Sequence, residues 1–192
     1  MKGYTSRQQI ENYLLITVDP SFYTQINSWI EQIETYIDKT TGRNFIADTV
    51  ASAKLYDGDG TSELLIDDCV DVTEVKIDDD VLVEGTDEDY LVYPANDLPK
   101  TKIKLLNDIF SHYNRQTISI TGKWGYSVAV PTDITMVATV LVAGMVNYSL
   151  NAEGEIKSRS IGTYSVTFKD EKQWQDFDRV QKVLDYYKKY KF

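Results

Sequence analysis

The 192-residue sequence contains a single cysteine, Cys69, and a single histidine, His112. One cysteine excludes a disulfide within the chain, and one cysteine with one histidine cannot fill the tetrahedral nitrogen and sulfur ligand set of a zinc site. Aspartates close to Cys69 in the sequence are expected to raise the pKa of its thiol, which disfavours a reactive thiolate. The sequence therefore offers no convincing cysteine–histidine nucleophile and predicts no enzyme of that class.

Long apolar runs are also scarce. The longest strongly apolar run, residues 136–146, is about half of the roughly 20 residues that a helix needs to cross a bilayer. The N-terminal sequence MKGYTSRQQI lacks the apolar stretch of a signal peptide. Together with the absence of disulfides, these features predict a cytoplasmic protein without membrane contact, and they predict that the apolar run is a core helix.

Glycine-rich and acidic stretches do not match the common ligand-binding motifs. GKWGYS lacks the spacing of a P-loop, and the segment that begins at Asp57 has Ser62 and Asp68 where an EF-hand requires glycine and glutamate. A calcium site of another kind at Asp57, Asp59 and Glu63 stays open, against the alternative that DGDG is a hairpin turn. No other metal site and no cofactor is expected.

Acidic residues are abundant and unevenly distributed. The formal net charge is −10, and residues 57–89 contain 14 acidic residues and one lysine, whereas residues 179–192 contain five cations and one acid. An acidic middle and a basic end imply partners of opposite charge. The acidic surface is predicted to include Asp78, Asp79, Asp80, Asp87, Glu88 and Asp89. The chain also has 14 tyrosines, a residue type that suits protein interfaces.

Helical periodicity appears at both ends of the chain. Thr5 or Ser6 is suited to cap a short first helix, and Asp19 with Pro20 is suited to begin a second, amphipathic helix that Gly42 ends. Residues 132–150 are predicted to form an apolar helix whose apolar positions cover nearly its whole circumference. Asp170 is suited to cap a final helix, whose amphipathic stripe is Trp174, Phe177, Val180, Leu184 and Tyr187.

Between these helices the period changes from 3.6 to 2. Strands are expected at 53–56, 63–66, 72–77, 90–93, 102–106 and 117–121, and an extended segment at 163–168 follows a polar loop. The predicted fold is α+β: one domain, 1–192, in which about four helices form a small bundle around the central helix 132–150. The N-terminal helices occupy 1–50, an antiparallel β-rich acidic insertion occupies 51–130, and 131–192 completes the bundle.

Taken in order, four segments resemble the head-tail connector (adaptor, or head-completion) proteins of long-tailed bacteriophages and prophages. They are IEQIETYIDKTTGRNF, the β insertion that opens with LYDGDG, TISITGKWGYSVAVPTDI, and IGTYSVTF followed by a helix. The resemblance implies a non-enzymatic structural protein of the virion, assembled in the host cytoplasm. It implies a ring, twelvefold in the virion and possible as a monomer in solution, that binds the portal protein and then a stopper or tail protein. The acidic insertion departs from the family pattern in its length and polarity.

Two surfaces follow as expectations. Subunit or portal contacts are expected at Ser160, Ile161, Tyr164 and Val166, and at Tyr187, Lys188, Lys189 and Tyr190. An acidic surface facing the channel of the ring would repel DNA phosphates, so that the genome passes without specific binding. Two other classes stay open: an acidic calcium-dependent or carboxylate-based enzyme, and a monomeric acidic module that binds basic proteins.

Overall fold

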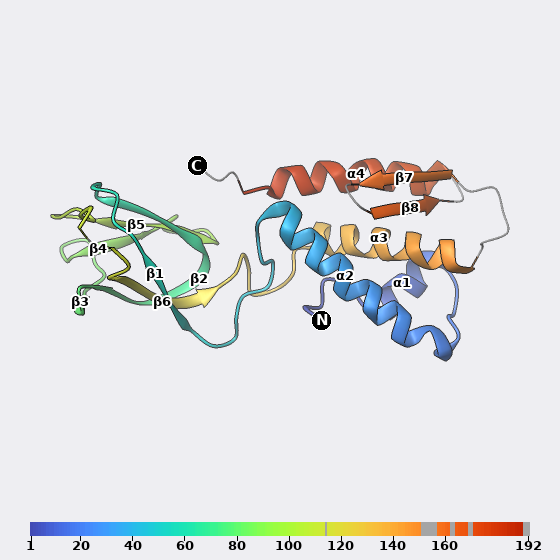
Figure 1. Ribbon diagram of the computed structural model, residues 1–192, viewed down its shortest axis with the longest axis horizontal. Coiled ribbons are helices and arrows are strands. Elements are labelled where there is room, and N and C mark those ends of the chain that lie inside the picture. The colour runs from blue at the N-terminus through green and yellow to red at the C-terminus, as the bar shows by residue number, and fades with distance from the viewer. Residues whose placement is uncertain (114, 151–156, 162–163, 169–170, 190–192) are drawn as a thin grey trace. The chain divides into compact units, whose positions relative to one another are not determined.

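The computed structural model describes residues 1–113, 115–150, 157–161, 164–168 and 171–189, with side chains described outside residues 151–178 (Figure 1). The chain divides into two compact units. The helical unit comprises residues 1–43 and 130–192, and the β unit comprises residues 44–129. The unit of strands therefore begins seven residues before the insertion expected at 51–130. Helices and an antiparallel sheet together confirm the predicted α+β class.

Residues that the sequence indicates as caps mark the first two helices, but α2 begins at Tyr23, three residues after the predicted start. Helix α1 (Arg7–Leu14) has Ser6 as N-cap, and Ser6 and Gln9 form the reciprocal hydrogen bonds of a capping box. Asp19 accepts a hydrogen bond from the Ser21 amide at the start of a 3₁₀ turn, η1 (Pro20–Phe22), which continues into α2 (Tyr23–Thr41). Gly42 ends α2 in a left-handed conformation, with φ 69°.

Helix α3 (Thr132–Leu150) is the centre of the helical unit. It packs against α1, α2, β8 and α4 (Glu171–Tyr187), and Figure 1 shows it running between α2 and α4. Its length and composition would allow it to cross a membrane, but 56% of its most apolar 18-residue window is buried. This burial agrees with the prediction of a core helix that has neighbours on most sides.

The segment after α3 differs from its prediction. Residues 157–160 belong to a strand, β7 (Lys157–Ile161), whereas the sequence predicted a polar loop there. Strand β7 pairs antiparallel with β8 (Tyr164–Phe168) in a separate two-stranded sheet. Serine and charged residues in β7 hid its alternation, because strand propensity reflects pairing and burial more than composition.

The β unit is a six-stranded antiparallel sheet in the order β1-β6-β2-β5-β4, with β3 on β2. Its strands are β1 (Ser52–Tyr56), β2 (Glu63–Ile77), β3 (Asp80–Leu82), β4 (Tyr90–Tyr93), β5 (Lys100–Leu105) and β6 (Ile118–Trp124). The first half of β2 pairs with β5 and the second half with β6 and β3. The two strands predicted at 63–66 and 72–77 are thus one bent strand, whose pairing register shifts near Cys69 and near Thr73.

The β unit encloses its own apolar core, which the two halves of β2 line together. Its members include Leu64, Ile66, Cys69, Ile103 and Trp124. Gly122 of β6 has no space for a side chain, because an added Cβ would lie 2.6 Å from the Cys69 Sγ and 2.7 Å from the Asp71 backbone oxygen. The bend of β2 is therefore built against a glycine.

Candidate functional site

The predicted acidic residues lie in the turn between β2 and β3, at the start of β3, and in the connection from β3 to β4. Asp78 and Asp79 form the two-residue turn between β2 and β3, and both have positive φ, at 50° and 73°. Ile77 pairs with Ile118, the first residue of β6, whereas Ser52, at the other end of the sheet, pairs with Gly122 near the last. The acidic turn is thus at the opposite end of β6 from the point where the chain enters the first strand.

All six predicted members of the acidic surface are exposed. Asp89 accepts a hydrogen bond at 2.8 Å from the Val83 amide and so orders the connection between β3 and β4. Within the described part of the chain, no lysine or arginine forms an ion pair with Asp79, Asp80 or the acidic residues 87–89. These five residues, which we call the acidic end, therefore carry charge that no ion pair with a described lysine or arginine neutralises.

Acidic residues on the strands have lysine neighbours instead. Glu63 lies 3.0 Å from Lys102 and 3.8 Å from Lys104 on the adjacent strand β5. Lys54 of β1 lies 2.8 Å from Asp67 and also covers the Trp124 ring, at 4.5 Å from its centroid. Cross-strand pairs of opposite charge stabilise a sheet modestly. In the segment 57–89, Glu63 and Asp67 on β2 therefore have lysine partners, whereas the residues of the acidic end have none among the described residues.

The calcium candidate is not assembled as a ligand cluster. Asp57 accepts a hydrogen bond at 2.9 Å from the Gln116 amide, and Glu63 faces Lys102. Asp59 accepts from the Thr61 hydroxyl and amide, and these hydrogen bonds lower the pKa of Asp59, the hydroxyl having the larger effect. Among the described residues, no group of three or more histidine, cysteine or acidic side chains is placed to hold a metal ion.

DGDG is not a hairpin turn either, because the strands on its two sides do not pair with each other. The loop packs instead against the segment that precedes β6. The Gly60 amide donates to the Phe110 oxygen at 2.7 Å, and a Cβ on Gly58 would lie 2.0 Å from the Ser111 oxygen. The two glycines therefore serve close backbone packing, with Gly60 at φ 82°.

Cys69 and His112 occupy different environments. Cys69 is fully buried, and its thiol donates to the Asp71 oxygen at 3.2 Å. Burial raises the pKa of Cys69, and the Asp71 carboxylate raises it further. His112 is exposed, with its ring against Gly60. A buried thiol with a raised pKa is a poor nucleophile.

The predicted contact residues near the C-terminus are placed in part. Tyr187 is buried in the helical unit, where its hydroxyl donates to the Asp133 carboxylate and its backbone oxygen accepts from the Arg43 guanidinium at 2.6 Å. The Lys189 amide donates to the Thr41 oxygen at 2.7 Å, and Lys188 is exposed. Tyr187 therefore stabilises the helical unit from within and is not part of the exposed contact surface expected near the C-terminus. Tyr190 lies outside the described residues.

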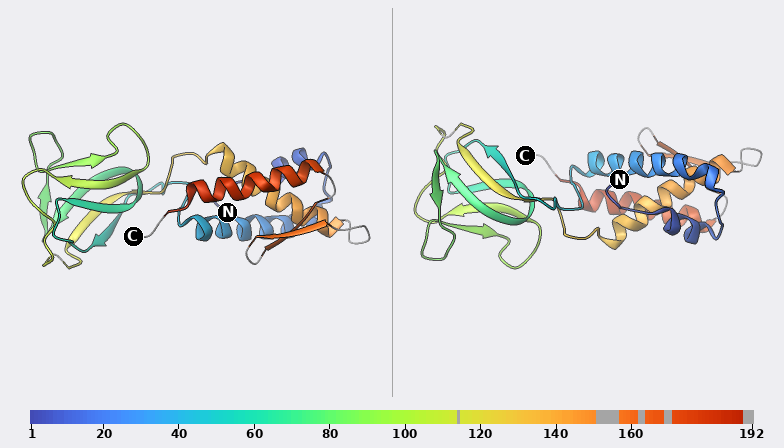
Figure 2. Two further views of the ribbon diagram at one scale, coloured as in Figure 1. Left: turned by 90° about the horizontal axis from the view of Figure 1, so that it is seen from above. Right: turned by 90° about the horizontal axis from the view of Figure 1, so that it is seen from below.

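The other predicted contact residues are in the β7–β8 hairpin, where the backbone alone is described. Ile161 pairs with Tyr164, Ser160 with Ser165, and Arg159 with Val166. Strand β8 packs along α3 and α4, whereas β7 is the outer strand of the pair (Figure 2). The expected extended segment is thus paired inside its own unit along one edge.

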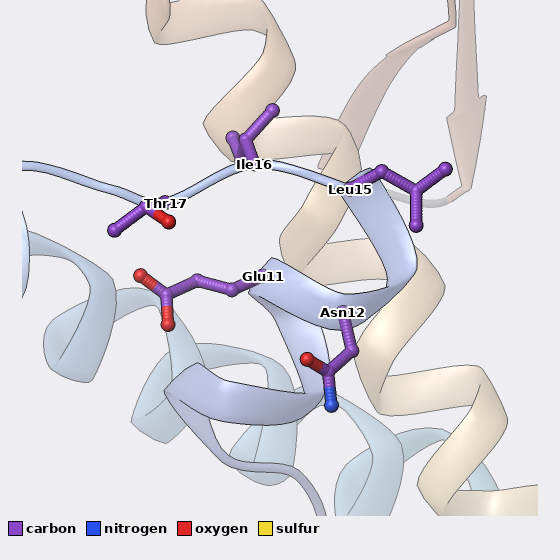
Figure 3. A pocket seen from close by; sticks show the side chains of 5 residues that line it. All are labelled: Glu11, Asn12, Leu15, Ile16 and Thr17. Carbon is purple, nitrogen blue, oxygen red and sulfur yellow. The ribbon is translucent and has the colours of Figure 1, made fainter.

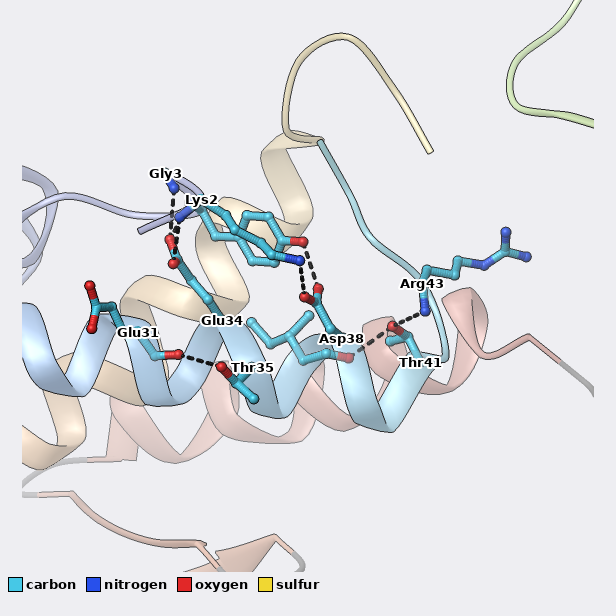
Figure 4. A network of polar contacts seen from close by, with 10 residues as sticks. Lys2, Gly3, Glu31, Glu34, Thr35, Asp38, Thr41 and Arg43 are labelled. Carbon is cyan, nitrogen blue, oxygen red and sulfur yellow. Dashed lines mark hydrogen bonds and ion pairs between the residues drawn. The ribbon is translucent and has the colours of Figure 1, made fainter. Parts of the chain in front are cut away.

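The start of the chain is fastened to α2 by a buried carboxylate (Figure 4). Glu34 is 3% exposed and accepts hydrogen bonds from the backbone amides of Lys2, Gly3 and Tyr4 at 2.6, 2.7 and 3.0 Å. The hydroxyl of Tyr4, a fully buried residue, donates to Asp38 at 2.6 Å. A glutamate on an amphipathic helix is ordinarily expected to face solvent, so this buried anchor could not be predicted from the sequence.

Several large apolar side chains are exposed where α1 connects to α2 and where α3 ends. They are Leu15 at 90%, Ile16 at 36%, Phe22 at 38%, Tyr148 at 55% and Leu150 at 43% exposed. Leu15 and Ile16 line a shallow pocket with Glu11, Asn12 and Thr17 (Figure 3). Val18, Phe22, Ile26, Trp29, Val146, Ser149 and Leu150 line a second, apolar crevice. Sequence reasoning missed this surface because these residues continue the apolar stripes of core helices.

Two solved structures share this fold. A chain in the neck of a native gene transfer agent particle, computed with C12 symmetry, is 14% identical, with 96% of this chain and 88% of that chain covered and a TM-score of 0.54. A chain in the neck of an empty particle, computed with C6 symmetry, is 12% identical, with 88% and 80% covered and a TM-score of 0.52. No family model and no curated protein matches the sequence. At this identity the likeness establishes the fold.

Proposed function

We propose that the chain is a structural neck protein of a tailed phage or phage-like particle, a head-tail connector of the adaptor type. The observation that carries the proposal is the extent of the structural likeness. Between 88% and 96% of the chain matches neck proteins of gene transfer agent particles, a span that requires both units. A likeness limited to the helices would support a common bundle, whereas the combination of bundle and inserted sheet is more specific.

In this role the protein docks as a ring under the portal protein after the head is filled, and then presents a surface to a stopper or tail protein. Twelvefold symmetry is expected for the ring, because one of the matching necks was computed with C12 symmetry. The chain reaches the virion from the host cytoplasm, where it can exist as a monomer. Head-to-tail contacts that close under rotation generate such a ring.

The protein acts without catalysis, cofactor or metal, and DNA passes it without specific binding. The acidic end supports this part of the proposal, since unneutralised carboxylates that face the channel repel phosphates. A ring structure that places the acidic end wholly outside the channel would contradict it. Unchanged DNA retention after replacement of these carboxylates by amides would contradict it as well.

The experiment is assembly on the cognate portal. Purified chain and portal rings are mixed and imaged by cryo-electron microscopy; a second ring of density under the portal, with twelve copies per portal by mass, is expected. The matched variant carries Lys188→Glu, at an exposed residue of the predicted contact surface, and should weaken the ring while circular dichroism shows an unchanged fold. The control is Tyr113→Asp, at a side chain 94% exposed in the β unit. Failure of the unmodified chain to bind the portal would reject the connector role.

A further inference from the structure

The two outer strands of the six-stranded sheet differ in how their free edges are protected. The strand order β1-β6-β2-β5-β4 leaves β1 at one end of the sheet and β4 at the other. A free edge presents unpaired backbone donors and acceptors, and natural proteins cover such edges or use them for pairing with another chain. The difference between these two edges therefore indicates which one is available.

The edge at β4 is covered by the segment that precedes it. Glu84 forms a β-bridge with Tyr90, the Gly85 amide donates to the Tyr90 oxygen at 3.0 Å, and the Tyr90 amide donates to the Val83 oxygen at 3.3 Å. Beyond β4, Lys100 donates to the Pro94 and Ala95 oxygens. Backbone pairing by another chain would have to displace these hydrogen bonds.

The edge at β1 has no such cover within the described residues. Strand β1 pairs with β6 alone, and its alternating burial leaves Ser52, Ala53 and Leu55 exposed, Leu55 at 60%. Its one charged residue, Lys54, turns to Asp67 and the Trp124 ring and so does not guard the edge. Val50, just before the strand, is 75% exposed. The Ser52 oxygen accepts a hydrogen bond from the Trp124 indole at 2.8 Å, and the rest of the strand, residues 53–56, is a pairing site without proline.

We infer that the β1 edge pairs with strand β7 of a second copy of this chain, which extends the six-stranded sheet across the subunit contact. The inference rests on the proposed ring and identifies one contact within it. Strand β7 is suited to this role because it belongs to a two-stranded sheet, pairs only with β8 in the described structure, and is also five residues long.

Charge complementarity favours this occupant. The β unit contains 17 acidic and 7 basic residues, so its net charge is −10, whereas β7 contains Lys157 and Arg159 in five residues and no acid. Opposite charge speeds association and disfavours pairing of two β1 edges with each other. Because β1 and β7 are different surfaces, the contact is head-to-tail, which is the geometry that a closed ring requires.

The test is disulfide cross-linking between two partners, each with one introduced cysteine, assembled on portal rings. Ala53→Cys or Leu55→Cys in one full-length chain is mixed with Ser158→Cys or Ser160→Cys in a second chain that carries a larger tag. Directly opposed residues of an antiparallel pair have Cβ atoms about 4.5–5.5 Å apart, near the range that a disulfide spans. Cys69 is fully buried and does not compete. A disulfide between the two different chains is expected in at least one pairing.

Val83→Cys mixed with Ser158→Cys is the matched control, at a residue 52% exposed whose backbone oxygen pairs with Tyr90 at the β4 edge, and should give no cross-link. Amide exchange of β1 supplies a second readout and should slow on the order of tenfold in the assembled ring. Rings with no cross-link in any of the four pairings, with links between like variants only, or with unchanged β1 exchange would overturn the inference and leave the proposed function standing. Absence of rings from the unmodified chain would overturn both.

Discussion

The two units of the chain differ in electrostatic character. The helical unit contains 13 acidic and 13 basic residues and is formally neutral, whereas the β unit contains 17 acidic and 7 basic residues. The entire net charge of −10 therefore belongs to the β unit. The overall acidity of the sequence is therefore a property of the β unit, and the helical unit has no net charge.

The units also tolerate their polar groups by different means. In the helical unit, a buried carboxylate is satisfied by three backbone amides, and α3 is apolar on nearly all sides. In the β unit, carboxylates on the strands face lysines on neighbouring strands, while those at the acidic end remain in solvent. Substitutions in the helical core, at the buried carboxylate, and at the paired and exposed carboxylates of the β unit test this difference between the two units.

The largest effect is expected in the core of the helical unit. Leu141→Ala in α3, at a side chain with no exposed surface, should lower the free energy of unfolding by about 2–5 kcal/mol, because it removes buried methyl groups and leaves a cavity. Chemical denaturation measures the loss. Leu65→Ala, at a leucine 64% exposed in the β unit, is the control and should change stability by about 0.5 kcal/mol or less. Equal losses would show that α3 is not the core element described.

Glu34→Gln should destabilise the helical unit by about 1–3 kcal/mol, because the glutamine amide group cannot accept from the three backbone donors as a carboxylate does. Amide exchange of residues 2–4 should accelerate, which localises the effect. Glu31→Gln, at a side chain 61% exposed that forms only a surface ion pair with the Met1 amino group at 3.5 Å, is the matched control and should cost about 0.5 kcal/mol or less. If both variants behave alike, Glu34 is not the anchor of the chain start.

High pH should weaken the β unit through Tyr90. Burial raises the pKa of Tyr90 to about 12, above the value near 10 expected in the unfolded chain. Its contribution to stability is therefore complete below pH 10 and is lost as the pH rises toward 12. Tyr90→Phe should remove about 1 kcal/mol of the alkaline loss at pH 11, with little change at pH 7. Burial likewise raises the pKa of Tyr56 to about 12, so part of the alkaline loss should persist.

The smallest effect is expected at the acidic end, and its sign is informative. Asp79→Asn should stabilise the β unit by about 0.3 kcal/mol at low salt, because it relieves repulsion and asparagine favours the left-handed conformation found there. Glu63→Gln should instead destabilise it slightly, since Glu63 faces two lysines. Thermal unfolding at two salt concentrations measures both. Effects of the same sign would contradict the division between paired and unpaired carboxylates.

The helices were predictable from local chemistry. Ser6 with Gln9, Asp19 with Pro20, and Gly42 mark helix ends through backbone hydrogen bonds or φ preferences that involve only nearby residues. The strand at 90–93 was likewise predicted at its observed bounds. The continuous strand β2 was not, because its acidic middle breaks the alternation and only pairing with both β5 and β6 holds it extended.

The candidate surfaces divide in the same way. Composition and periodicity were enough to predict the α+β class, the apolar central helix and the concentration of acid in the insertion. The folded chain was needed to learn which carboxylates face lysines, that Tyr187 is buried, and that β1 has an open edge while β4 is covered. Those properties depend on side chains and strands brought together from distant positions, which no local pattern encodes.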